Sequence, residues 1–118
     1  MMSLHKFFRS FRHALRGIAY AVREERNFHF ELAVAIAVVF FAWYFPLTTD
    51  ERTTLTLAIV LVLSLELVNT SFERMLDMTK PRVHPYVRVI KDLVAGSVLI
   101  SAIGAAIIGA LIFPRYIM

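Results

Sequence analysis

Three long apolar segments constrain what this chain can fold into more than any other feature. They are FHFELAVAIAVVFFAWYF at residues 28–45, TLTLAIVLVLSLELVNTSF at residues 54–72 and LVAGSVLISAIGAAIIGALIF at residues 93–113. A hydrocarbon core about 30 Å thick needs roughly 20 apolar residues in a helix, and these segments are too long and too uniform for barrel strands. We therefore expect an all-α integral membrane protein with three transmembrane helices.

The composition agrees with a membrane protein and excludes several other classes. Of the 118 residues, 58% are hydrophobic, against about 45–50% in soluble domains. The length suits one domain, residues 1–118. The absence of cysteine excludes disulfides and thiolate metal sites. The net charge of +4, beside such apolar segments, favours an anionic membrane surface over nucleic acid as the partner.

The first segment of the chain, residues 5–25, has a different pattern. Its apolar residues recur every three or four positions, at Phe7, Phe11, Leu15, Ile18 and Val22. Its basic residues fall mostly on the opposite side of a helix, at Lys6, Arg9, Arg12, His13 and Arg16. This pattern predicts an amphipathic helix that lies in the membrane interface.

The distribution of basic residues predicts the orientation in the membrane. The connection at residues 46–53 has one basic residue, whereas the connection at residues 77–92 has Lys80, Arg82, Arg88 and Lys91. Basic connections stay on the cytoplasmic side. We therefore expect a multi-pass protein with its N-terminus and second connection in the cytoplasm.

The second apolar segment ends in a row of polar residues. Glu66, Asn69, Glu73 and Asp77 are three, four and four positions apart, so they lie on one face of a helix. Glu66 lies about 10 Å deeper than Glu73, at 1.5 Å per residue. A carboxylate inside a membrane is costly and marks a candidate functional site.

The predicted topology brings other charged residues to the level of this row. Glu24 and Glu25 precede the first span, and Lys91 and Asp92 precede the third. Carboxylates from two helices suit Mg²⁺ shared with phosphate oxygens, and a lysine suits a transferred phosphoryl group. A buried Glu66 suits a general base.

Each of these residues also has an ordinary structural interpretation. Glu73, Asp77 and Lys91 fit charges at helix ends, and Glu24 with Glu25 fits a solvated cluster beside arginines. Asn69 fits a bridge between helices. Glu31 fits a partner for a basic residue, and His84 fits a loop histidine. The small residues of the third span fit close helix packing; they are Ser97, Ser101, Ala105 and Gly109.

Four motifs together resemble the bacterial diacylglycerol kinase family of small homotrimeric membrane lipid kinases. They are ERNF (25–28), ELVNTSFERMLD (66–77), HP (84–85) and KDLVAG (91–96). The likeness extends from about residue 6 to residue 113. The residues of the first two motifs are most similar to those of the undecaprenol kinase branch. The residues themselves favour an oligomer, because three spans alone cannot enclose a polar site from lipid, and the resemblance implies that it is a homotrimer.

The resemblance implies a role for each matching position. Glu66 corresponds to the base that takes the proton from the lipid hydroxyl, and Asn69 to an active-site amide. Glu25 and Glu73 correspond to the pair that holds Mg²⁺ and the nucleotide phosphates. The implied nucleotide contacts are Lys6, His13, Asp77, Arg82, Val83, His84, Lys91 and Asp92. The implied lipid-site residues are Glu31, Glu66 and Ala95.

The chain departs from the family pattern in two places. Ser71 and Phe72 replace more usual residues inside the second motif, and YVRVI (86–90) is more apolar than usual. Neither departure removes a chemical group that the reaction needs. The phosphate-binding loop of other nucleotide enzymes is absent, as it is in this family.

Together with the residue patterns, the resemblance implies a lipid kinase of the bacterial cytoplasmic membrane that uses ATP with Mg²⁺. Undecaprenol is the preferred acceptor, and diacylglycerol is the alternative. A proton-coupled transporter with Glu66 as proton carrier explains one buried carboxylate but not the other charges gathered near it. A non-catalytic membrane scaffold is a further alternative.

Overall fold

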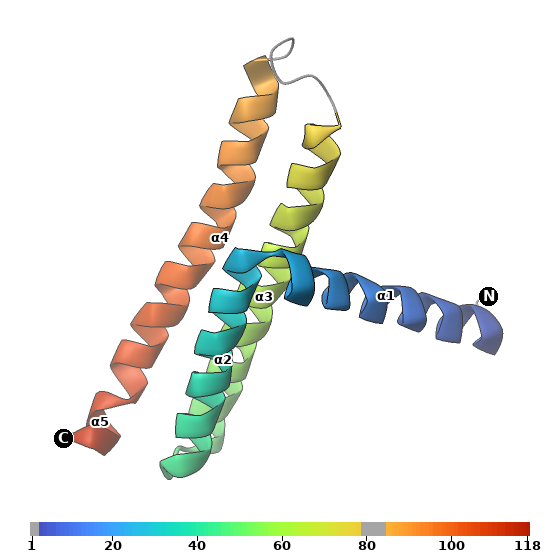
Figure 1. Ribbon diagram of the computed structural model, residues 1–118. Helices are drawn as coiled ribbons and strands as arrows, with labels where there is room; N and C mark the ends of the chain where they lie inside the picture. The colour runs from blue at the N-terminus through green and yellow to red at the C-terminus, as the bar shows by residue number, and fades with distance from the viewer. Residues whose placement is uncertain (1–2, 79–84) are drawn as a thin grey trace.

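The computed structural model describes residues 3–78 and 85–118. They form five helices, with no strand among the described residues. The helices are α1 (Leu4–Glu24), α2 (Arg26–Tyr44), α3 (Thr49–Asp77), α4 (Pro85–Ile112) and α5 (Pro114–Ile117). Helices α2, α3 and α4 run alongside one another, and α1 projects sideways from them (Figure 1).

Local sequence explains where these helices begin. Ser3 caps α1 by accepting a hydrogen bond from the Lys6 amide at 3.2 Å. Thr48 and Glu51 form a capping box at the start of α3, with reciprocal bonds of 3.1 and 2.9 Å. Pro85 opens α4, where its missing N–H would have had no partner in any case.

The chain turns sharply between α1 and α2 at a single residue. Glu25 has extended backbone angles, with φ −108° and ψ 110°, and therefore interrupts the helix. Its amide still bonds to the Ala21 carbonyl at 3.0 Å, so the turn stays tight. This corner packs against α3, because α1 contacts both α2 and α3.

Three helices are long and apolar enough to cross a membrane, as the sequence predicts. Two of them exceed the expected spans: α3 starts five residues before position 54 and ends five after position 72, and α4 starts eight before position 93. A helix of 29 residues is about 44 Å long, against about 30 Å of hydrocarbon. The polar end turns therefore remain helical beyond the hydrocarbon core.

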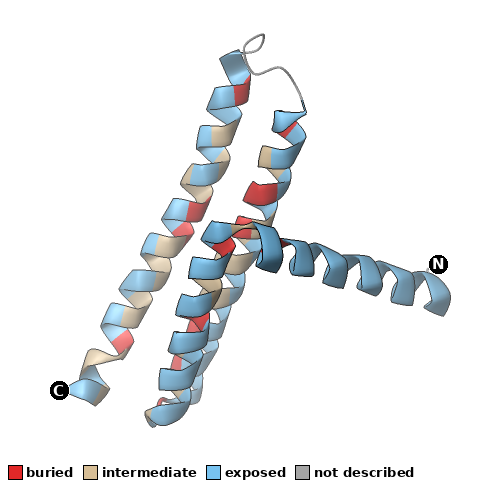
Figure 2. Ribbon diagram, viewed as in Figure 1, coloured by how far each residue is buried: buried red, intermediate tan, exposed pale blue. Residues whose placement is uncertain are grey.

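Packing inside the single chain is sparse. Helices α3 and α4 share the most extensive contact, and α2 packs on α3. A small apolar core at the end remote from α1 contains Leu47, Leu55 and Ile112. Most of the remaining helix surface is exposed (Figure 2), including large side chains such as Trp43 and Leu111. Such surfaces suit lipid or other protein chains.

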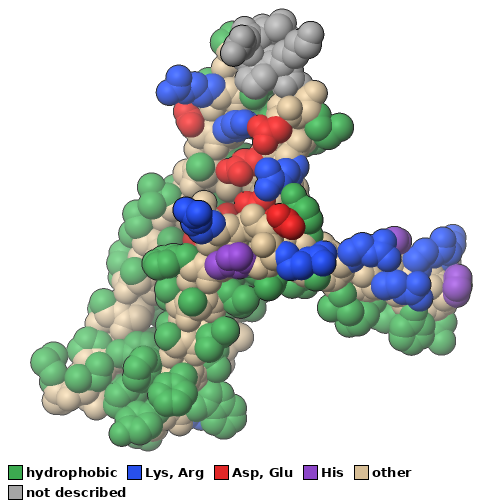
Figure 3. Space-filling model, in the orientation of Figure 1, with side chains coloured by type: hydrophobic (Ala, Val, Ile, Leu, Met, Phe, Trp, Pro, Cys, Tyr) green, Lys and Arg blue, Asp and Glu red, His purple; other side chains and the backbone are tan. Residues whose placement is uncertain are grey.

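The four small residues of the third span lie in α4, where their role in close helix packing stays a prediction. Ser101 is buried, and Ala105 and Gly109 line a groove shared with α2 and α3. Figure 3 shows most of the charged side chains on this face at and above the level of α1, with mainly hydrophobic side chains below. Along α1, basic side chains lie on one side and hydrophobic ones on the other (Figure 3).

Candidate functional site

The polar row on α3 is buried at its inner end and open at its outer end. Glu66, Asn69 and Thr70 are 3%, 5% and 6% exposed. Glu73 is half-buried, and the side chain of Asp77 is about half exposed. The spacing of these residues aligns them on one face, as the sequence predicts. The row therefore leads from a polar surface into the protein.

Three buried polar atoms near this row lack hydrogen-bond partners among the described residues. They are Asn69 Oδ1, Thr70 Oγ1 and Glu31 Oε2. The amide nitrogen of Asn69 is engaged, because it donates to Glu73 Oε1 at 3.1 Å. A buried polar atom without a partner costs about 1–3 kcal/mol. These atoms are thus available to a bound ligand.

The Glu66 carboxylate lies among other carboxylates. Its electrostatic neighbours include Glu31 of α2, Glu73 of α3 and Glu25 of the α1–α2 corner. Because Glu31 belongs to the second turn of α2, Glu66 lies near the level at which α2 begins. Acidic groups from three parts of the chain therefore meet at one level and favour the binding of cations.

Arg74 supplies one cation to this cluster. Its guanidinium forms an ion pair with Glu25 and donates from Nε to the Tyr20 hydroxyl at 3.0 Å. It also lies 4.0 Å from Asp77 Oδ2 and over the Tyr20 ring. Arg74 and Tyr20 are not among the site residues predicted from the sequence. Only the position of Arg74, next to Glu73 and one turn before Asp77, could have indicated it.

Lys91 supplies a second cation and connects α4 to the row. Its Nζ donates to Asp77 Oδ1 at 2.7 Å. Asp92 and Ala95, also on α4, are exposed. The structure therefore joins Lys91 to the acidic row, whereas Asp92 and Ala95 face away from the chain's interior.

Other predicted site residues are not joined to the cluster in this chain. Lys6 and His13 are exposed and belong to α1, which projects away from the bundle (Figure 1). Arg82, Val83 and His84 lie outside the described residues. The single chain thus brings Glu25, Glu31 and Lys91 to the polar row of α3, and leaves Asp92, Ala95 and the α1 positions apart.

The oxygen donors near Glu73 fit Mg²⁺. This ion is usually held by one or two carboxylates together with substrate phosphates and water. Glu73 provides a carboxylate, and the unpartnered Asn69 Oδ1 lies on the same face. Among residues 3–78 and 85–118, no group of three or more His, Cys, Asp or Glu residues could hold a metal by itself. Any such ion would therefore depend on phosphate oxygens for part of its shell.

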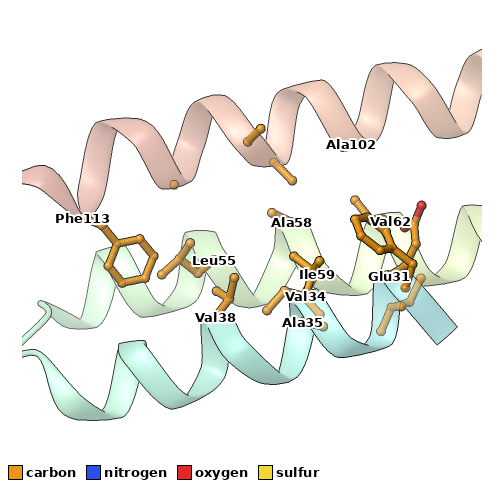
Figure 4. Close-up of a pocket in the computed structure, with 15 residues that line it drawn as sticks. Glu31, Val34, Ala35, Val38, Leu55, Ala58, Ile59, Val62, Ala102 and Phe113 are labelled. Atoms are coloured by element: carbon orange, nitrogen blue, oxygen red, sulfur yellow. The ribbon is translucent and has the colours of Figure 1, made fainter. Parts of the chain in front are cut away.

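An apolar groove of about 430 Å³ runs between α2, α3 and α4. It extends from Phe113 at one end to Glu31 at the other (Figure 4). Its walls are almost entirely aliphatic, with Val34, Leu55 and Ala102 among them. Because Glu31 also neighbours Glu66, the groove ends beside the buried part of the polar row.

Comparison with known proteins gives consistent matches. The family model for prokaryotic diacylglycerol kinase matches residues 12–113. The chain is 42% identical over 110 residues to undecaprenol kinase of Bacillus subtilis, covering 93% of this chain and 89% of that protein. It is 38% identical over 101 residues to diacylglycerol kinase of Synechocystis sp., covering 85% of this chain and 58% of that protein. The chain thus spans less than two thirds of the second relative's length.

Proposed function

Because the chain belongs to the prokaryotic diacylglycerol kinase family, and is therefore a membrane lipid kinase, we propose that its acceptor is undecaprenol. The relative matched over nearly its whole length is named for this acceptor. Diacylglycerol is the alternative, because another relative is named for it. In either case ATP is the co-substrate.

One observation carries the assignment of the site: an apolar groove ends beside a buried row of polar groups. A lipid alcohol has the same division, with a long apolar chain and one hydroxyl. The end of the lipid chain next to the hydroxyl would lie in the groove, with the hydroxyl toward Glu31 and Glu66. The rest of the chain would leave through the open side into the bilayer.

In this arrangement Glu66 acts as the general base. Its carboxylate accepts the proton of the lipid hydroxyl while the hydroxyl oxygen attacks the γ-phosphorus. The bond between that phosphorus and the β–γ bridging oxygen breaks, and ADP leaves. Burial of Glu66 at 3% exposure keeps competing water away from the transferred group. Asn69 orients the reactants through its free carbonyl oxygen.

The outer half of the row binds the nucleotide. Glu25 and Glu73 would hold Mg²⁺, which neutralises charge on the phosphate oxygens when bound. Lys91 of α4, whose ammonium group is held by a hydrogen bond to Asp77 of α3, stabilises the negative charge of the transferred group. Further contacts come from Asp77 and Asp92, and from Arg82, Val83 and His84. The lipid site includes Ala95 at its α4 edge.

The membrane setting follows the charge distribution. Helix α1 lies in the interface with its phenylalanines toward lipid and its basic side toward anionic headgroups. The N-terminus, the acidic row and the nucleotide face the cytoplasm of a bacterial cell. There ATP is available, and the lipid hydroxyl reaches the surface. Three copies of the chain form the functional unit.

A direct assay tests this proposal. Purified protein in mixed micelles receives Mg²⁺ and ATP labelled at its γ-phosphate, with undecaprenol or diacylglycerol supplied separately. We expect label in undecaprenol and at least a 100-fold loss of rate for Glu66→Gln, because removing a general base costs about 10²–10⁴-fold. Size-exclusion chromatography would confirm that the variant is assembled.

Two results would contradict parts of the proposal. Label mainly in diacylglycerol would replace the acceptor and leave the mechanism unchanged. Near-full activity of an assembled Glu66→Gln variant would show that Glu66 is not the base.

A further inference from the structure

Glu25 has an unusual position for a residue that would contribute to metal binding. It is the single extended residue that separates α1 from α2, so it belongs to neither helix and no helical turn fixes the orientation of its side chain. The side chain is nevertheless only 13% exposed. Its orientation must therefore be fixed by contacts with another element.

Arg74 of α3 provides that contact. Its guanidinium pairs with Glu25, and its Nε donates to the Tyr20 hydroxyl at 3.0 Å. The Tyr20 ring lies 5.9 Å from the guanidinium carbon. Arg74 thus makes two contacts with Tyr20 of α1 and one with Glu25 at the α1–α2 corner.

The same side chain is linked to the predicted nucleotide side. Arg74 lies 4.0 Å from Asp77 Oδ2, and the other oxygen of Asp77 accepts from Lys91 at 2.7 Å. A continuous set of charged contacts therefore connects α1, the α1–α2 corner, α3 and α4. Arg74 is the only member among the described residues that touches both Glu25 and Asp77.

We infer that Arg74 is a positioning residue that, with Tyr20, holds the Glu25 carboxylate toward the acidic row, so that Glu25 and Glu73 act on one Mg²⁺–nucleotide complex. The inference rests on the proposed function, which assigns Glu25 and Glu73 to that complex. Outer partners of metal-binding carboxylates set the orientation of the carboxylate, and their loss costs about 10–100-fold in metal affinity. Arg74 acts through Glu25 and need not contact the reacting atoms.

The test compares Arg74→Met and Arg74→Lys with the wild-type protein. We expect Arg74→Met to raise the Mg²⁺ concentration for half-maximal activity by about 10-fold, with a much smaller change in rate at saturating Mg²⁺. Arg74→Lys retains one charged donor, so it should restore part of the affinity. Arg23→Met is the matched control, because Arg23 is exposed and has no ion pair among the described residues.

A second measurement does not depend on turnover. Binding of Mn²⁺ in the presence of a non-hydrolysable ATP analogue, followed by electron paramagnetic resonance, should weaken by a similar factor in Arg74→Met. A merely structural role would lower the thermal unfolding midpoint without moving the Mn²⁺ affinity. If Arg74→Met does not assemble, the Mn²⁺ affinity is measured in Tyr20→Phe instead. It removes the hydroxyl that accepts from Arg74 Nε, and we expect about a threefold weakening.

The outcomes separate this inference from the proposed function. If wild-type protein transfers no phosphate to either lipid, the proposed function fails, whereas the Mn²⁺ measurement still tests Arg74. If wild-type protein is active and Glu25→Gln weakens Mn²⁺ binding, an unchanged or tighter affinity in assembled Arg74→Met overturns the inference alone. The same holds for an unchanged affinity in Tyr20→Phe.

Discussion

Thr70 places a hydroxyl in the buried part of α3, where Oγ1 has no hydrogen-bond partner among the described residues. Thr53, Thr54 and Thr56 of this helix behave differently, because each donates to the carbonyl four residues earlier; for Thr56 the distance to the Arg52 carbonyl is 2.8 Å. An unpaired buried hydroxyl lowers stability by about 1–3 kcal/mol. We attribute its presence to a hydrogen bond that forms only when a substrate is bound.

Thr70→Val tests this interpretation, because it removes the hydroxyl and retains the branched shape. We expect the stability to stay the same or rise slightly, while kcat/KM falls by about 10-fold through the loss of a hydrogen bond to a charged substrate. Thermal unfolding and initial rates in detergent would measure both. Thr56→Val is the control, and we expect its kcat/KM to equal that of the wild type. An unchanged kcat/KM in Thr70→Val would exclude the role.

At this scale the sequence indicates the residues that share one helix face. Glu66, Asn69 and Glu73 could be identified from their spacing alone, because helix geometry fixes their directions. The contacts of Arg74 could not, since they depend on how the α1–α2 corner meets α3, 49 positions away from Glu25 in the chain. The roles of Lys6 and His13 stay predictions, because their helix leaves the cluster.

Helix α5 attaches the C-terminal segment to the beginning of α3. The buried carboxylate of Glu51 accepts hydrogen bonds from the Thr48 amide at 2.9 Å, from the Tyr116 hydroxyl and from Arg115. The Tyr116 ring also packs near Phe45, with ring centroids 6.2 Å apart. These contacts close the end of the bundle that holds the apolar core.

Tyr116→Phe separates the hydrogen bond from the ring packing. Since the phenylalanine keeps the ring but leaves a buried carboxylate with one donor fewer, we expect the thermal unfolding midpoint to fall by about 5 °C. Activity below that temperature should be unchanged, because the acidic row lies at the opposite end of α3. Tyr44→Phe is the control, since the Tyr44 side chain is exposed. An equal midpoint for both variants would exclude this stabilising role of α5.

The element scale also shows why helix lengths differ from the hydropathy pattern. Apolar composition marks the hydrocarbon-spanning part, residues 54–72, whereas α3 continues to Asp77. The added turns carry Glu73 and Asp77, whose charges lower mean hydropathy without breaking a helix. The capping box at Thr48 and Glu51 was present in the sequence, but its pairing with Tyr116 depends on tertiary contact.

The whole molecule differs between its two ends. The end with α5 has an apolar core and a buried polar cluster, whereas the end with the acidic row contains ion pairs between its helices. Open space also surrounds two glycines of α4, because a Cβ at Gly96 or Gly104 would meet no atom within 4 Å. Another helix can approach α4 there. In the proposed homotrimer, a helix of another chain would occupy this space.

A trimer would also explain the distant positions on α1. Lys6 is exposed and belongs to α1, which points away from the bundle (Figure 1). We therefore predict that Lys6 serves the site of a neighbouring chain. Lys6→Glu should then reduce activity strongly, because it replaces a phosphate-attracting charge with a repelling one.

Mixing inactive chains tests this prediction. Glu66→Gln and Lys6→Glu chains, each with a different affinity tag, are co-expressed and purified through both tags. A site that combines Glu66 of one chain with Lys6 of its neighbour would be intact in such a mixture, so the mixture should be far more active than either parent. Double-tagged Glu66→Gln protein is the control. Failure of the tags to co-purify would contradict the oligomer, and a co-purified but inactive mixture would show that each chain contains its own complete site.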